Sequence, residues 1–100
     1  MELTLEMFKQ TRDAYVQALE SEDIPEIMER GICHYMNKKY DVGLSVYEFV
    51  GKNYRDSLSH RRTYVVPTIA HGVPIDVAIP PRIKLLEKII SDVESGKVRL

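Results

Sequence analysis

The last quarter of the chain carries the pattern that most limits the fold. In "PRIKLLEKIISDVESG" the apolar residues recur every three or four positions, the spacing that brings side chains to one face of an α-helix. These residues are Ile83, Leu86, Ile90 and Val93, with Leu85 and Ile89 widening the face. Proline at the first helical position and Gly96 just beyond the end are typical helix boundaries. The segment therefore predicts a helix over residues 81–95.

Earlier segments show the same period. The first predicts a helix from about residue 3 to 20, with Thr4 as the N-cap. Its apolar face comprises Leu5, Phe8, Tyr15, Val16 and Leu19, with the stem of Arg12 lying along it. Asp23 and Glu26 have the spacing of a capping box, which predicts that a second helix begins there and runs to about residues 38–40. We expect Gly31 inside this helix, where another helix approaches closely.

A second capping-box pattern, Ser45 with Glu48, predicts a third helix over residues 45–58. Between it and the final helix lies "SHRRTYVVPTIAHGVPIDVAIPPR", an apolar stretch with four prolines and no helical period. Proline disfavours a regular sheet, so we expect a long ordered loop or a short β-hairpin. The sequence predicts a mainly α-helical fold, with residues 1–100 forming a single four-helix domain.

The single cysteine, Cys33, excludes an intramolecular disulfide and favours a reducing compartment. The N-terminus has no signal-peptide pattern, and no apolar run approaches the roughly 20 residues of a membrane span. We therefore expect a cytoplasmic protein that does not bind membranes. His34, His60 and His71 lack the spacing of metal ligands, so neither a metal nor another cofactor is expected. Without a catalytic motif, the chain is not expected to be an enzyme.

The densest cluster of cations in this nearly neutral chain lies at the start of the proline-containing segment. Arginine forms forked hydrogen bonds with phosphate or carboxylate, and tyrosine offers a flat stacking face. Arg82 follows Pro80 and Pro81 at the expected start of the final helix, where free N–H groups favour anions. The predicted anion-binding residues are Arg55, His60, Arg61, Arg62, Tyr64 and Arg82.

Three short motifs occur in an order that resembles a group of small accessory proteins of tailed bacteriophages: "RGICHYM" at 30–36, "TYVVP" at 63–67 and "PRIKLLEKII" at 81–90. The tryptophan typical of that group before its final helix is missing here. The resemblance implies an accessory protein made during infection that acts on a host component, including host defence systems, in the host cytoplasm. It carries over no catalytic residue.

The leading interpretation is a non-enzymatic protein that binds and sequesters an anionic small ligand, such as a nucleotide defence signal, or a host factor. The first alternative is a protein–protein inhibitor that acts through the acidic face of the first helix. Residues 1–30 carry eight acids and three bases, whereas residues 31–100 carry seven acids and eleven bases. These opposed charges, together with an apolar loop, also predict a homo-oligomer.

The second alternative is a small helix-turn-helix DNA-binding protein. Its second helix would present Tyr47, Lys52, Asn53 and Arg55. The chain lacks the strong basic face that phosphate neutralisation requires, so nucleic acid is not the favoured partner.

Overall fold

The computed structural model describes residues 2–28, 30–54 and 75–100, and only the backbone of residues 75–78. The described residues form helices α1 (Leu5–Ser21), α2 (Ile32–Tyr40), α3 (Ser45–Asn53) and α6 (Ile75–Glu94), with a short 3-10 turn, η1 (Glu26–Met28). No strand occurs among them. The predicted mainly α-helical, four-helix fold is confirmed, whereas the predicted loop or hairpin falls largely outside the described residues.

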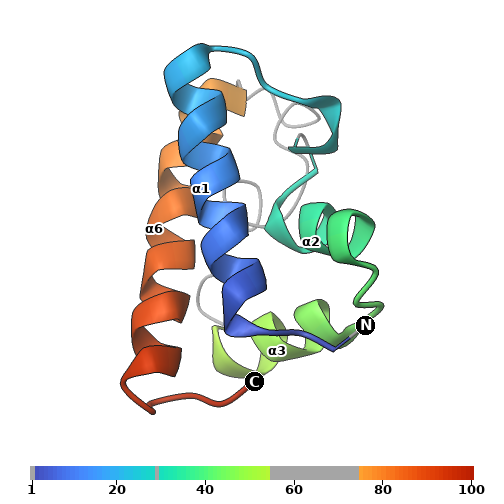
Figure 1. Cartoon of the computed structure of the whole chain (residues 1–100), viewed down its shortest axis with the longest axis vertical. Helices are drawn as coiled ribbons and strands as arrows, with labels where there is room; N and C mark the ends of the chain where they lie inside the picture. Colours follow the sequence, from blue (N-terminus) through green and yellow to red (C-terminus); the bar gives the residue numbers. More distant parts are fainter. Residues whose placement is uncertain (1, 29, 55–74) are drawn as a thin grey trace.

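Helices α1 and α6 lie side by side and run in opposite directions (Figure 1). Helix α2 packs beside α1, and α3 crosses the end of the molecule where α1 begins and α6 ends. A surface ion pair between Lys9 Nζ and Glu94 Oε2, 3.1 Å long, joins α1 to α6 at that end. Exposed pairs of this kind contribute little, so the apolar faces must hold the helices together.

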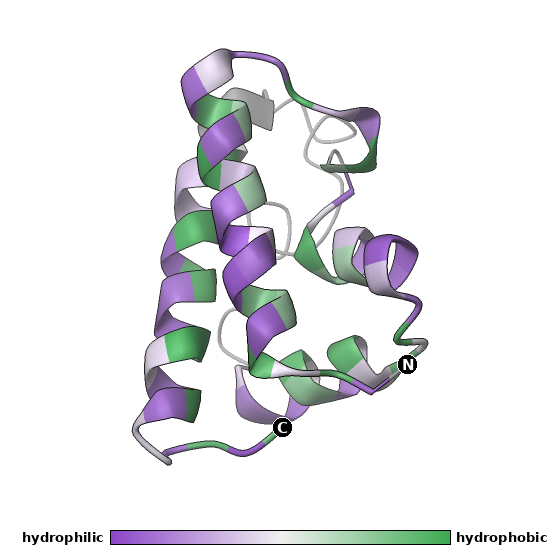
Figure 2. Ribbon diagram, viewed as in Figure 1, coloured by the Kyte–Doolittle hydropathy of each residue, from purple (hydrophilic) through white to green (hydrophobic). Residues whose placement is uncertain are grey.

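Those faces meet in one core, and the polar residues cover the outside of the bundle (Figure 2). Two aromatic contacts connect α1 to its neighbours, Phe8–Phe49 to α3 and Tyr15–Tyr35 to α2, with ring centroids 5.5 and 5.7 Å apart. A third, Phe49–Tyr54, lies within α3 and its C-cap, at 5.9 Å. Tilted rings at these separations add to the stabilisation from burial alone. The Tyr54 hydroxyl also donates a 2.9 Å hydrogen bond to Asp92 Oδ2, which ties the end of α3 to α6.

Two predicted helix ends are confirmed. Thr4 is the N-cap of α1, and its hydroxyl oxygen accepts a 3.3 Å hydrogen bond from the Met7 N–H. After α6, the Lys97 N–H donates to the Asp92 carbonyl at 2.8 Å and the Gly96 N–H donates to the Val93 carbonyl at 3.2 Å. This is the Schellman arrangement, and Gly96 adopts the positive φ of 83° that it requires.

The predicted second helix is wrong in its first half. Only the η1 turn forms there, and the Asp23–Glu26 capping box is absent, because the Asp23 N–H bonds to the Ser21 hydroxyl instead. Gly31 lies outside a helix, with φ 107° and ψ 171°, and α2 begins at the next residue. Glycine alone adopts this backbone region readily. Gly31 therefore makes a sharp bend before α2.

The third and final helices also differ from prediction. Helix α3 begins at Ser45, as predicted, but it ends at Asn53 instead of near residue 58. The Ser45 hydroxyl donates to the Val42 carbonyl at 2.7 Å, so Leu44 is the N-cap of α3 and no capping box forms. Helix α6 begins at Ile75, so that Pro80 and Pro81 lie inside it. Each proline removes one backbone donor. Complete burial of Ile79 in the core favours the helical turn despite this loss.

Candidate functional site

A basic hollow on the outer side of α2 is the strongest candidate site among the described residues. Its volume is about 490 Å³, and we call it the α2 hollow. It is lined by Glu26, Ile27, Arg30, His34 and Lys38. Three of these five side chains carry or can acquire a positive charge, and one is acidic. The hollow therefore suits an anionic group better than an apolar or cationic one.

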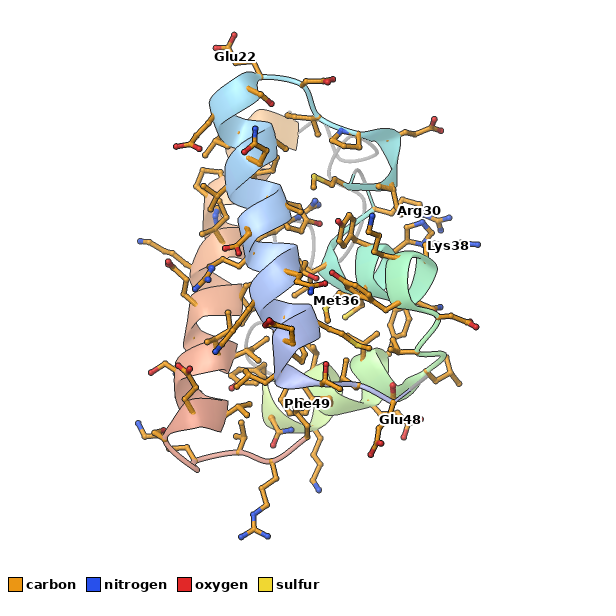
Figure 3. All side chains as sticks on the ribbon, in the orientation of Figure 1. Glu22, Arg30, Met36, Lys38, Glu48 and Phe49 are labelled. Atoms are coloured by element: carbon orange, nitrogen blue, oxygen red, sulfur yellow. The ribbon has the colours of Figure 1, made fainter. Side chains whose placement is uncertain are left out.

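The local fold explains why the three basic side chains meet. His34 and Lys38 are four residues apart on α2 and share one face. Arg30 precedes the Gly31 bend, yet its side chain lines the same hollow. Figure 3 shows Arg30 and Lys38 close together on the side of α2 that faces away from α1, whereas Met36 lies toward α1. The opposite face of α2 is buried, which fixes the orientation of the basic face.

The positive charges act on one another across the hollow. Partial burial, together with the charges of Arg30 and Lys38, lowers the pKa of His34 below its usual value of 6.5. The described ion pairs do not include Arg30 or Lys38, and both residues are exposed. Their charges are therefore available to a ligand, and an anion in the hollow would relieve their mutual repulsion.

Arg82 is buried next to η1, the turn that forms one wall of this hollow, and does not reach the surface. Its side chain is completely buried, and Nη1 donates a 2.6 Å hydrogen bond to the carbonyl oxygen of Met28, the last residue of η1. The guanidinium carbon also lies 5.9 Å from the centre of the Tyr15 ring. Arg82 thus links α6 to α1 and holds the η1 turn, which supplies Glu26 and Ile27 to the α2 hollow.

Tyr15 is the residue whose ring lies against the buried Arg82 guanidinium. Burial raises the pKa of the Tyr15 hydroxyl above its ordinary value, and the charge of Arg82 opposes the rise. The hydroxyl is near Arg82, but it has no hydrogen bond of good geometry within the part of the chain that the structure describes. The guanidinium therefore contacts Tyr15 through its ring face.

The predicted position of Arg82 at a helix N-terminus is wrong. Helix α6 begins seven residues earlier, at Ile75, so the free N–H groups of its first turn lie elsewhere. Burial and the bond to Met28 direct the guanidinium into the molecule, where it positions the chain instead of facing solvent. The other predicted anion-binding residues lie outside the described residues: Arg55, His60, Arg61, Arg62 and Tyr64.

Cys33 is packed into the core beside Ile32, as its inward position on the predicted helix indicated, with 2% of its surface exposed. Burial raises the pKa of its thiol to about 12, so the reactive thiolate is scarce at neutral pH. Its neighbour His34 faces the α2 hollow. Among the residues described, no group of three or more histidine, cysteine or acidic side chains could hold a metal ion.

The helix-turn-helix alternative depends on α2, α3 and the turn between them. Helix α3 has only nine residues, and Lys52 is its one basic side chain. The Asn53 amide donates to the Phe49 carbonyl at 3.0 Å, so this group is engaged within its own helix. Tyr47 is exposed, and Arg55 lies beyond the described residues. Helix α3, as described, therefore offers few side chains that could recognise DNA bases.

The sequence did not reveal the α2 hollow, because its basic residues are not adjacent in the chain. His34 and Lys38 are four residues apart, so their common face appears only when they are placed on a helix, and Arg30 reaches the same hollow from before the Gly31 bend. The four-residue period was the signal that could have revealed it. The prediction of one helix running through Gly31 did not expose the bend and the η1 wall that complete the hollow.

The part of the chain that the structure describes contains no helix long and apolar enough to cross a membrane. No protein-family model matches the chain, and neither a curated protein nor a solved structure shows significant similarity to it.

Proposed function

We propose that the protein is a non-enzymatic binding protein that sequesters an anionic small ligand in the α2 hollow. The observation that carries the proposal is the meeting of Arg30, His34 and Lys38 around one hollow. Within it, Arg30 and Lys38 offer charge-assisted hydrogen bonds, which are stronger than neutral ones. A phosphate or carboxylate group is the chemistry that matches these donors.

A small ligand suits the dimensions of the hollow. A volume of about 490 Å³ falls within the roughly 300–1,000 Å³ of ordinary small-molecule sites. Ile27 gives the hollow an apolar patch, and the Glu26 carboxylate can accept a hydrogen bond from a ligand hydroxyl or amine. A nucleotide combines all three features: a phosphate, hydroxyl donors and an apolar ring. The accessory role in phage infection that the sequence resemblance implies would fit such sequestration.

Calorimetric titration tests this proposal. The wild-type protein is titrated with adenosine monophosphate, a cyclic dinucleotide and pyrophosphate, and the same panel is applied to the Arg30→Gln/Lys38→Gln variant. Loss of two charge-assisted bonds, each worth about 1–1.5 kcal/mol at an exposed site, predicts at least about tenfold weaker binding. Because both side chains are exposed, the variant is expected to keep its melting temperature.

A matched control separates the hollow from overall charge. The Lys52→Gln/Lys97→Gln variant removes two exposed positive charges elsewhere, so its net charge equals that of the test variant. Binding that weakens equally in both variants, or in neither, would contradict the assignment to the α2 hollow. An Arg61→Ala/Arg62→Ala variant tests the basic cluster predicted from sequence. If this variant alone loses binding, the ligand site lies at that cluster.

A second candidate function, a protein–protein inhibitor, is favoured by the outer surface of α1. Glu6, Asp13 and Glu20 are exposed and seven residues apart, so they form one acidic stripe along the helix. Figure 2 shows hydrophilic residues along the length of α1. A basic partner surface would match the stripe. A Glu6→Gln/Glu20→Gln variant that still inhibits its target would argue against it.

A further inference from the structure

We propose that the α2 hollow selects a tetrahedral dianion, such as a terminal phosphate, and that the His34 imidazole takes up a proton as the dianion binds. This inference rests on the proposed function and specifies its ligand and its dependence on pH. It starts from the place of His34 in the hollow. The side chain lies four residues from Lys38 on one side and from Arg30 on the other, and all three line the same surface.

The free hollow disfavours a third positive charge. Arg30 and Lys38 repel a protonated His34, and partial burial acts in the same direction. The only acidic side chain that lines the hollow within the described residues is Glu26, on the η1 wall. At neutral pH the described lining of the hollow therefore carries two positive charges, one negative charge and a neutral imidazole. The neutral His34 imidazole can still accept one proton.

A dianion reverses this balance. Its two negative charges offset the repulsion from Arg30 and Lys38 and attract the protonated imidazole. A terminal phosphate has three free oxygens, enough to accept one hydrogen bond from each of the three basic side chains. A phosphodiester has two free oxygens and one negative charge, so it stabilises protonated His34 less than a dianion does. The hollow should therefore prefer a terminal phosphate over a diester.

Linkage fixes the direction of the pH effect. If the dianion raises the pKa of His34, then protonation strengthens binding by the same factor. Affinity should increase as the pH falls through the bound-state pKa, and it should level off below the free-state pKa. The free-state value lies below 6.5, so the increase belongs to mildly acidic and near-neutral conditions. A rise of about one pKa unit corresponds to about tenfold tighter binding by the protonated form.

The test follows the imidazole proton signals of His34 by NMR across a pH titration at constant ionic strength. Sulfate and methyl sulfate serve as probes, because they are tetrahedral and differ in charge, and neither titrates near neutral pH. A His34→Gln variant assigns the signals, and His71 provides an internal reference. A change in the pKa of His60 would instead report anion binding at the basic cluster predicted from sequence. We expect saturating sulfate to raise the pKa of His34 by about one unit and methyl sulfate to raise it by less than half as much.

The possible outcomes separate this inference from the proposed function. If sulfate or a nucleotide binds, the Arg30→Gln/Lys38→Gln variant weakens that binding, and the pKa of His34 does not move, then proton uptake is refuted while anion binding in the hollow stands. An equal shift with methyl sulfate refutes the preference for a dianion. If none of these anions nor any ligand of the calorimetric panel binds, both proposals fail. The affinity of His34→Gln for sulfate should lose most of its pH dependence between about pH 6 and about pH 8.

Discussion

Replacing Arg82 with methionine tests whether the buried arginine holds the wall of the α2 hollow. The Arg82→Met side chain keeps a long apolar stem inside the core but removes the guanidinium. The Met28 carbonyl then loses the 2.6 Å hydrogen bond that joins η1 to α6. The Tyr15 ring also loses the positive charge that lies 5.9 Å from its centre.

The magnitude follows from these two losses and one opposing gain. A buried carbonyl left without its donor destabilises a protein by about 1–3 kcal/mol. A desolvated cation–π contact contributes up to about 2 kcal/mol. Methionine avoids the unfavourable desolvation of a fully buried charge, which offsets part of this loss. We expect a net decrease of about 2 kcal/mol in the free energy of unfolding, which lowers the Tm of a 100-residue domain by roughly 10 °C.

Urea denaturation followed by circular dichroism measures the change. Lys84→Met provides the control, because Lys84 is exposed on the same helix and should change stability by no more than about 0.5 kcal/mol. Equal or greater stability of Arg82→Met would refute the reasoning. It would mean that burial of the charge outweighs its contacts, and that Arg82 is present for a reason other than holding η1.

Four further predictions concern single features. Tyr15→Phe removes a buried hydroxyl without a good hydrogen bond, so the free energy of unfolding should stay within about 0.5 kcal/mol of wild type or rise; a clear loss would contradict this. Gly31→Ala should destabilise the protein more than Gly43→Ala, because the φ of 107° at Gly31 is far less accessible to alanine than the φ of 63° at Gly43. Equal denaturation midpoints for the two variants would argue against the bend at Gly31. Tyr54→Phe should lower stability by about 1.5 kcal/mol through loss of the bond to Asp92, and an unchanged midpoint would show that solvent replaces it. Light scattering should show a homo-oligomer, and a monomer mass at micromolar concentration would refute that prediction.

The sequence was most informative where one local signal decided the outcome. The apolar period of the final segment predicted the buried face of α6, and Thr4 and Gly96 predicted the ends of two helices. These features depend on side-chain spacing and on the chemistry of one turn. The burial of Cys33 followed from the same periodicity.

The errors arose where long-range packing outweighed a local signal. Pro81 was interpreted as the start of a helix, but burial of Ile79 favours a longer one. Arg82 was expected at an exposed helix N-terminus because it follows Pro80 and Pro81, and nothing in the sequence shows that the Met28 carbonyl, fifty-four residues earlier, accepts its hydrogen bond. The hollow itself combines η1, a glycine bend and one face of α2, so only the folded chain brings its walls together.

Chemical-shift mapping tests the central claim, anion binding in the α2 hollow, most directly. Backbone amide spectra of the labelled wild-type protein are recorded during titration with pyrophosphate at constant ionic strength. The account predicts saturable shifts centred on residues 26–38, with the largest changes near Arg30, His34 and Lys38. Shifts centred instead on Arg55–Tyr64, or no saturable change anywhere in the chain, would contradict it.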